Sequence, residues 1–216
     1  PSPILDKGHT LILGWSPRIF TILKELAVAN QNVRKPLVVV FANVDRAVMD
    51  AEIAKRAGDL GNLKVITRKG DTTSPTDLMR ANVSGAKSVI VLDSDRGGDA
   101  MIVATVLAAK SISTNPDQKF VAEVDDPNTA EALEDSTNGQ VVTVIPRDVI
   151  AKVTAQASRQ PGIPAVILEL LDFAGDEIYF VEVPALEGKT YFEAQLSFAK
   201  AAILGVVPFG QTPVLN

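Results

Sequence analysis

Short runs rich in β-branched residues recur along the first two-thirds of this chain, at intervals of roughly 20 to 30 residues. Each run is followed by a segment whose apolar residues recur with helical spacing. The runs are Thr10–Trp15, Leu37–Phe41, Val65–Arg68, Ser88–Leu92, Phe120–Val124 and Val141–Ile145. Because short apolar runs that alternate with helices are typical of parallel strands buried on both faces, the pattern predicts an α/β fold with a Rossmann-like, doubly wound parallel sheet.

The composition changes after the last of these runs. Residues Pro146–Arg159 are predicted to form a crossover helix that ends at Gln160-Pro161-Gly162. Shorter elements are predicted beyond it: helices around Val166–Leu171 and Phe192–Leu196, and strands at Glu177–Val183 and Ile203–Phe209. We therefore predict a Rossmann-like domain over residues 8–145, a connector helix over 146–162 and a small α+β lobe over 163–216.

Polar residues with capping chemistry stand where the predicted helices begin. A side-chain oxygen at the N-cap accepts a hydrogen bond from a free backbone N–H of the first turn. The predicted caps are Ser16 with Pro17 after it, Asp45, Ser74, Asp99 and Asp126.

Composition and charge exclude several classes of function. The net charge is −5 and no basic stripe alternates with aromatic residues, which argues against binding to nucleic acid. The chain has no cysteine, so disulfides and thiolate metal sites are excluded, and its single histidine, His9, cannot form a histidine metal cluster. The longest apolar stretch, Ala100–Ala109, is shorter than the roughly 18 residues of a membrane helix, so we expect this fragment to be soluble.

The turn after the first predicted strand departs from a dinucleotide-binding fingerprint. That fingerprint places three glycines in the order G-x-G-x-x-G, and only Gly14 is present here. Pro17 also removes an amide donor that could hold a phosphate at the helix start. The acid expected near Asn43 for ribose binding is displaced to Asp45. The sequence therefore argues against NAD or ATP, with Gly14, Ser16 and Asp45 as the only weak candidates.

Motifs for catalysis are missing as well. Neither tyrosine is followed by lysine four residues later, and the chain has no G-x-S-x-G elbow and no phosphate loop that ends in Gly-Lys-Ser/Thr. We therefore predict that the chain is not an enzyme.

Acidic residues gather where the fourth and fifth predicted strands end. They are Asp93 and Asp95 after the fourth strand, and Glu123, Asp125 and Asp126 at the end of the fifth. Glu123 and Asp125 share one face of their strand, with Cα atoms about 6.6 Å apart. Adjacent strands would bring both groups together, and oxygen ligands suit Ca²⁺ or Mg²⁺. The alternative is that these acids cap helices or are solvated loop charges.

Several segments carry a resemblance to a known family. The resemblance to the cytoplasmic part of the Castor/Pollux ion channels lies in Gly8–Ser16, Leu37–Val40, Ala86–Leu92 and Gln160–Gly162. More broadly, the chain resembles RCK domains, which are regulators of potassium conductance with TrkA-N-like and TrkA-C-like parts. Gly70-Asp71 with Asp77-Leu78 resembles the RCK loop and helix after the third strand, and Leu186–Thr190 with Ile203–Val206 resembles the small C-terminal lobe.

The resemblance implies a ligand-sensing domain of a potassium-type cation channel that forms a homo-oligomeric gating ring, tetrameric or larger. It implies a place on the cytoplasmic side of a membrane, with the pore segment in the same full-length protein. In calcium-gated relatives, acids at positions like those of Asp93, Glu123 and Asp125 bind Ca²⁺. The small lobe of these relatives continues for two more strands, so we expect it to be truncated here.

Two other functions are left open by the residues. One is a nucleotide-sensing regulatory subunit of a potassium uptake system, which would respond to NADH or ATP. The other is an oligomerisation scaffold that binds no ligand.

Overall fold

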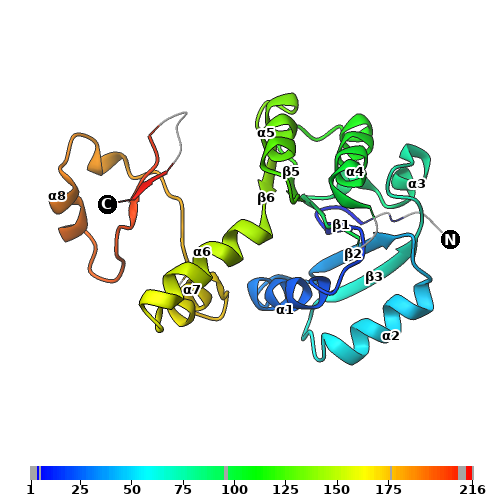
Figure 1. Ribbon diagram of the computed structural model, residues 1–216, viewed down its shortest axis with the longest axis horizontal. Helices are drawn as coiled ribbons and strands as arrows, with labels where there is room; N and C mark the ends of the chain where they lie inside the picture. Colours follow the sequence, from blue (N-terminus) through cyan, green and yellow to red (C-terminus); the bar gives the residue numbers. More distant parts are fainter. Residues whose placement is uncertain (1–3, 5, 95–96, 176, 209–212, 216) are drawn as a thin grey trace. The chain divides into compact units, whose positions relative to one another are not determined.

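The computed structural model of the chain describes residues 4, 6–94, 97–175, 177–208 and 213–215 (Figure 1). It divides into two compact units, Pro1–Glu177 and Ile178–Asn216, and each is described here by itself. The division into a domain over residues 8–145, a connector over 146–162 and a lobe over 163–216 stays a prediction. Within the described residues, no helix combines the length and the apolar character needed to cross a membrane.

The first unit is built on a parallel sheet of six strands. The strands are β1 (Thr10–Leu13), β2 (Leu37–Ala42), β3 (Lys64–Lys69), β4 (Ser88–Val91), β5 (Lys119–Glu123) and β6 (Val141–Val144). Their order is β3-β2-β1-β4-β5-β6, which confirms the predicted doubly wound fold, and each predicted strand end lies within two residues of the observed one. Strands β2 and β3 are therefore added on one side of β1, and β4 to β6 on the other. Folds of this kind bind their ligands where the order changes, between β1 and β4.

Helices cover both faces of this sheet (Figure 1). One face carries α1 (Ile19–Ala29) and α2 (Arg46–Arg56), and the other carries α3 (Pro75–Arg80), α4 (Gly98–Ile112), α5 (Pro127–Ser136) and the short 3₁₀ helix η1 (Val83–Gly85). Because successive strand residues point to opposite faces, Ile12 packs under α1 while Leu11 and Leu13 pack under the other layer. Two apolar cores result, one on each side of the sheet.

Three of the predicted helix caps are confirmed, and two are wrong. The side chains of Asp45, Ser74 and Asp126 accept hydrogen bonds from the first turns of α2, α3 and α5. Ser16 does not cap α1, because Pro17 and Arg18 form a turn and the helix begins only at Ile19. Asp99 does not cap α4, because the helix begins at Gly98 and the Asp99 carboxylate reaches a neighbouring loop instead.

The chain after the sheet begins with two packed helices. The first, α6 (Pro146–Arg159), has the predicted bounds, and α7 (Ile163–Leu171) begins three residues earlier than predicted. These two helices contact each other within the first unit.

The second unit is small and differs from its prediction in its strands. It contains a 3₁₀ turn η2 (Pro184–Leu186), helix α8 (Tyr191–Leu196) and an antiparallel pair of β7 (Gly205–Val206) with β8 (Val214–Leu215). The predicted strand at 177–183 is not a strand, because alternation alone forms no ladder without a partner strand. The predicted strand from Ile203 is reduced to β7, and its last residue, Phe209, lies outside the described residues.

Candidate functional site at the carboxyl ends of the central strands

The turn between β1 and α1 lies tightly against the end of β4. Gly14 has φ of +106°, and a Cβ atom on it would lie 2.4 Å from the carbonyl oxygen of Leu92. The turn is fixed by the Gly14 amide, which donates to the Phe41 carbonyl at 3.0 Å, and by the Leu92 amide, which donates to the Leu13 carbonyl at 2.9 Å. Gly14 is thus required by backbone packing alone, with or without a bound nucleotide.

An ion pair spans the point where the strand order reverses. The Arg18 guanidinium, just before α1, lies 2.6 Å from Oε1 of Glu123 at the end of β5. The Arg18 side chain is 51% exposed, whereas the Glu123 side chain is only 9% exposed. The pair therefore joins a buried acid of β5 to the start of α1, across the end of the intervening strand β4.

The environment of Glu123 favours its neutral form. Burial raises the pKa of Glu123 above its ordinary value, and the negative charge of Asp93 raises it further. The Arg18 charge and the Asp93 backbone amide act in the opposite direction, without outweighing burial. The structure thus brings Asp93 and Glu123 close enough to interact, as the strand order predicts.

A second set of contacts holds the loop after β5. The two carboxylate oxygens of Asp99, in the first turn of α4, accept hydrogen bonds from the backbone amides of Asp125 and Asp126, both at 2.8 Å. The Arg147 side chain, in the first turn of α6, donates to the Asp125 carbonyl at 3.0 Å. The β5–α5 loop is thereby tied to both α4 and α6.

Three predicted metal ligands remain: Asp95, Asp125 and Asp126. The Asp126 carboxylate accepts from the Asn128 amide and so caps α5, and Asp125 is exposed beside it. Asp95 lies outside the described residues. Over the described ranges, no group of three or more acidic or histidine side chains is arranged to hold a metal ion. The Ca²⁺ site stays a prediction, with Asp93 and Glu123 as the pair that the fold brings together.

Contacts within the protein account for two of the three weak nucleotide candidates, Gly14 and Asp45. The Asp45 carboxylate accepts from the Ala47 amide at 2.9 Å, so the cap of α2 occupies it. Ser16 is buried, and its hydroxyl has no hydrogen-bond partner among the described residues. Whether the chain binds NAD or ATP stays a prediction.

Sequence reasoning missed Arg18 as a member of this site. A signal for it exists, because a cation at the start of a helix is disfavoured by the helix dipole unless an acid lies nearby. The partner, Glu123, could be found only from the strand order.

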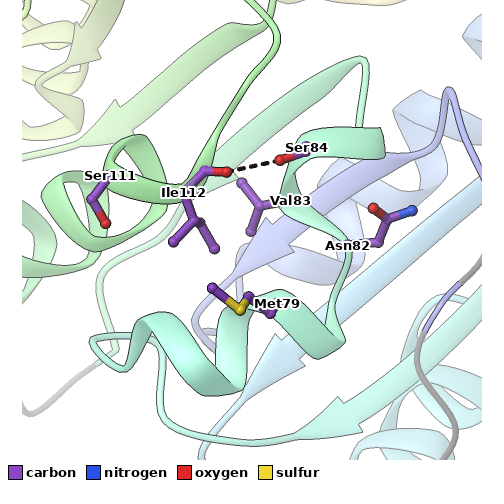
Figure 2. Close-up of a pocket in the computed structure, with 6 residues that line it drawn as sticks. All are labelled: Met79, Asn82, Val83, Ser84, Ser111 and Ile112. Atoms are coloured by element: carbon purple, nitrogen blue, oxygen red, sulfur yellow. Dashed lines mark hydrogen bonds between the residues drawn. The ribbon is translucent and has the colours of Figure 1, made fainter.

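A cavity of about 380 Å³ lies elsewhere, between α3, η1 and the last turn of α4 (Figure 2). Its lining residues are Met79, Asn82, Val83, Ser84, Ser111 and Ile112, with Ser84 Oγ donating to the Ile112 carbonyl at 2.8 Å. Because none of these lining side chains is titratable, this cavity does not compete as a site for cation chemistry.

The raised pKa of Glu123 predicts a specific pH dependence of stability. Because the folded chain holds this proton more tightly than the unfolded chain, the associated stability is present below the ordinary pKa of 4.5 and is lost as pH rises through the raised pKa. The wild type should therefore lose stability relative to Glu123→Gln as pH rises from about 4.5 towards neutrality. Denaturant unfolding of both proteins across this range measures the difference. A difference that is flat with pH would contradict the prediction.

Comparison with known proteins assigns the sheet to a family. A family model described as the TrkA-N domain matches residues 10–145, which is more than half of the chain. The chain belongs to the TrkA-N domain family. Residues 147–214 match a second model, described as "Castor and Pollux, part of voltage-gated ion channel". These two matches confirm the resemblance inferred from the sequence. The matched ranges meet at the start of α6.

The curated relatives are plant ion channels. The chain is 32% identical over 221 residues to "Probable ion channel CASTOR" of Oryza sativa subsp. japonica, which covers 100% of this chain and 25% of that protein. It is 33% identical over 208 residues to "Probable ion channel POLLUX" of Arabidopsis thaliana, which covers 95% of this chain and 25% of that protein. The chain thus spans about a quarter of the length of these relatives. Since they are channels, the prediction that the chain is not an enzyme agrees with them.

A solved structure matches the fold of the TrkA-N domain. The TrkA-N domain of the inner membrane protein ybaL from Escherichia coli superposes with a TM-score of 0.52 at 19% sequence identity. It covers 71% of this chain and 98% of that chain.

Proposed function

We propose that this chain is the regulatory part of a cation channel of the Castor/Pollux type, and that Ca²⁺ bound where β4 and β5 end controls it. The ion-channel relatives support the channel assignment. The observation that carries the cation site is the buried Glu123 carboxylate, which lies beside Asp93 and is paired with Arg18. In this proposal the permeant ion is of the potassium type.

The Arg18 guanidinium occupies the place that a bound cation would take. Asp93 and Glu123 repel each other, and Arg18 offsets this repulsion. The Arg18 side chain is half exposed and can turn into solvent, provided that a bound cation takes over compensation of the buried Glu123 charge. A divalent ion with oxygen ligands would then bridge the two carboxylates, with Asp125 nearby on the loop.

Release of Arg18 would couple the site to the rest of the fold. The start of α1 would lose its link to β5, and any shift of the β5–α5 loop would reach α4 through Asp99 and α6 through Arg147. Regulation by this route requires that Ca²⁺ bind two states of the domain with different affinity.

The proposal includes a homo-oligomeric ring, tetrameric or larger, on the cytoplasmic side of a membrane, with the pore in the same full-length protein. The helices α6 and α7 have no buried residue, although both are rich in apolar residues such as Ile150 and Leu168. Val142 and Val144 are also exposed on the edge strand β6. These apolar surfaces are our candidates for contacts between subunits.

Calorimetric titration with Ca²⁺, with Mg²⁺ for comparison, tests the site. We expect saturable Ca²⁺ binding that is lost in the double variant Asp93→Asn/Asp125→Asn. We also expect about fivefold or greater tightening in Arg18→Gln, which removes the competing cation. The control Asp117→Asn/Asp172→Asn changes the net charge equally and should bind Ca²⁺ like the wild type. Unchanged binding in the Asp93/Asp125 variant would show that the site is assigned wrongly.

A second candidate function is a scaffold that binds no ligand. It is favoured by the same ion pair, because Arg18 already compensates the buried Glu123 charge. The absence of Ca²⁺ binding up to millimolar concentrations, in a chain that still assembles, would support the scaffold. A rise in melting temperature with NADH or ATP would instead favour the nucleotide-sensing subunit.

A further inference from the structure

The edge of the sheet opposite the candidate cation site is lined with lysines. Each strand from β1 to β5 begins at a lysine or within three residues after one: Lys7, Lys35, Lys64, Lys87 and Lys119. The acids of the candidate site lie instead at the carboxyl ends of β4 and β5. Since the chain as a whole carries a net charge of −5, the amino edge is a local concentration of positive charge.

Part of this edge forms a cavity. A cavity of about 170 Å³ lies at the amino ends of β1, β2 and β4, and its lining includes the cationic side chains of Lys7, Arg34, Lys35 and Lys87. Asp6 is the only acid in the lining, so four cations face one carboxylate. Among the ion pairs formed by described residues, none involves any of these four cations. Among the described residues that line the cavity, cations therefore outnumber acids by four to one.

A buried histidine also lines the cavity. His9 is 1% exposed. Burial lowers the pKa of His9, against the raising effect of its hydrogen bonds with the Ala81 and Asp6 backbone and of the Asp6 charge. The ring is therefore neutral at neutral pH, and the positive charge of the cavity comes from the lysines and the arginine alone.

We propose that this cavity binds the phosphoryl group of an anionic ligand. A net of three positive charges around one cavity suits a multivalent oxyanion better than a single carboxylate, and Arg34 can donate two parallel hydrogen bonds to phosphoryl oxygens. The phosphoryl group can come from a soluble phosphate compound or from the headgroup of an anionic lipid. The cavity lies at the opposite edge of the sheet from Glu123, so this site does not depend on the proposed Ca²⁺ site.

Pyrophosphate and lipid vesicles are the two probes. Calorimetry of the 216-residue chain with pyrophosphate tests the soluble source, and co-sedimentation with phosphatidylcholine vesicles that contain phosphatidic acid tests the headgroup. The variant is Lys35→Gln/Lys87→Gln, in which both side chains are exposed and line the cavity. The matched control is Lys55→Gln/Lys152→Gln, with the same charge change on α2 and α6. Circular dichroism establishes that both variants are folded.

We expect binding of at least one probe to weaken by about tenfold or more in the cavity variant and to be unchanged in the control. Pyrophosphate binding with this pattern would identify a soluble ligand, and the same pattern with vesicles alone would identify a lipid headgroup. No binding of either probe, or equal weakening in both variants, would overturn the proposal.

Discussion

Replacement of Gly14 by alanine is expected to destabilise the fold by at least about 3 kcal/mol. The backbone there has φ of +106°, which side-chain-bearing residues rarely adopt, and the new Cβ would lie 2.4 Å from the Leu92 carbonyl oxygen. The contact is with backbone, so no side-chain rotation can relieve it. To accept the methyl group, the β1–α1 turn would have to move away from β4, which would also displace Arg18 from Glu123.

The measurement is denaturant-induced unfolding of the wild type and two glycine variants. Gly58→Ala is the matched control, because Gly58 also has positive φ, +71°, but a Cβ atom there would have no neighbour within 4 Å. We expect this control to lose only about 1 kcal/mol, the cost of the backbone conformation. Equal losses in the two variants would contradict the argument that close packing against Leu92 makes Gly14 necessary.

Replacement of Asp99 by alanine is expected to cost about 2 kcal/mol and to loosen the β5–α5 loop. The carboxylate accepts two backbone hydrogen bonds, from the amides of Asp125 and Asp126. Hydrogen bonds to a charged acceptor are stronger than neutral ones, and the partial exposure of Asp99 to solvent reduces the free energy lost with them. Asp99→Asn keeps one acceptor oxygen and should lose about half as much.

Amide hydrogen exchange measures the local part of this effect. The amides of Asp125 and Asp126 should exchange faster in Asp99→Ala than in the wild type, because both lose their acceptor. The control is Asp126→Ala, which removes the cap of α5 and should cost about 1 kcal/mol. If the two amides stay equally protected in Asp99→Ala, the proposed link between the loop and α4 is wrong.

Much of the fold could be predicted because its signals are local. The β-branched runs have the length and spacing of buried parallel strands, and Asp45, Ser74 and Asp126 cap helices through hydrogen bonds to residues two or three positions further along. The same local reasoning fails at Ser16 and in the segment 177–183. In the first case the Pro17-Arg18 turn delays the helix, and in the second no strand pairs with the segment.

The candidate site could be predicted only in part. The acids at the ends of two adjacent strands follow from strand order, so the meeting of Asp93 with Glu123 was predictable. The pairing of Arg18 with Glu123 and the bonding of Asp99 to the β5–α5 loop were not, because each joins groups from distant segments.

Local patterns of side-chain size, branching and capping thus established the strands of the parallel sheet and the starts of α2, α3 and α5, since each depends on neighbours along the chain. The strand order followed from the usual order of doubly wound folds. The identity of the partners across the sheet depends on how the helices pack and where each loop ends. This packing paired Arg18 with Glu123, directed Asp99 away from its own helix and gathered Lys7, Lys35 and Lys87 around one cavity. Such contacts arise from the simultaneous packing of several segments, and no single segment of the sequence encodes them.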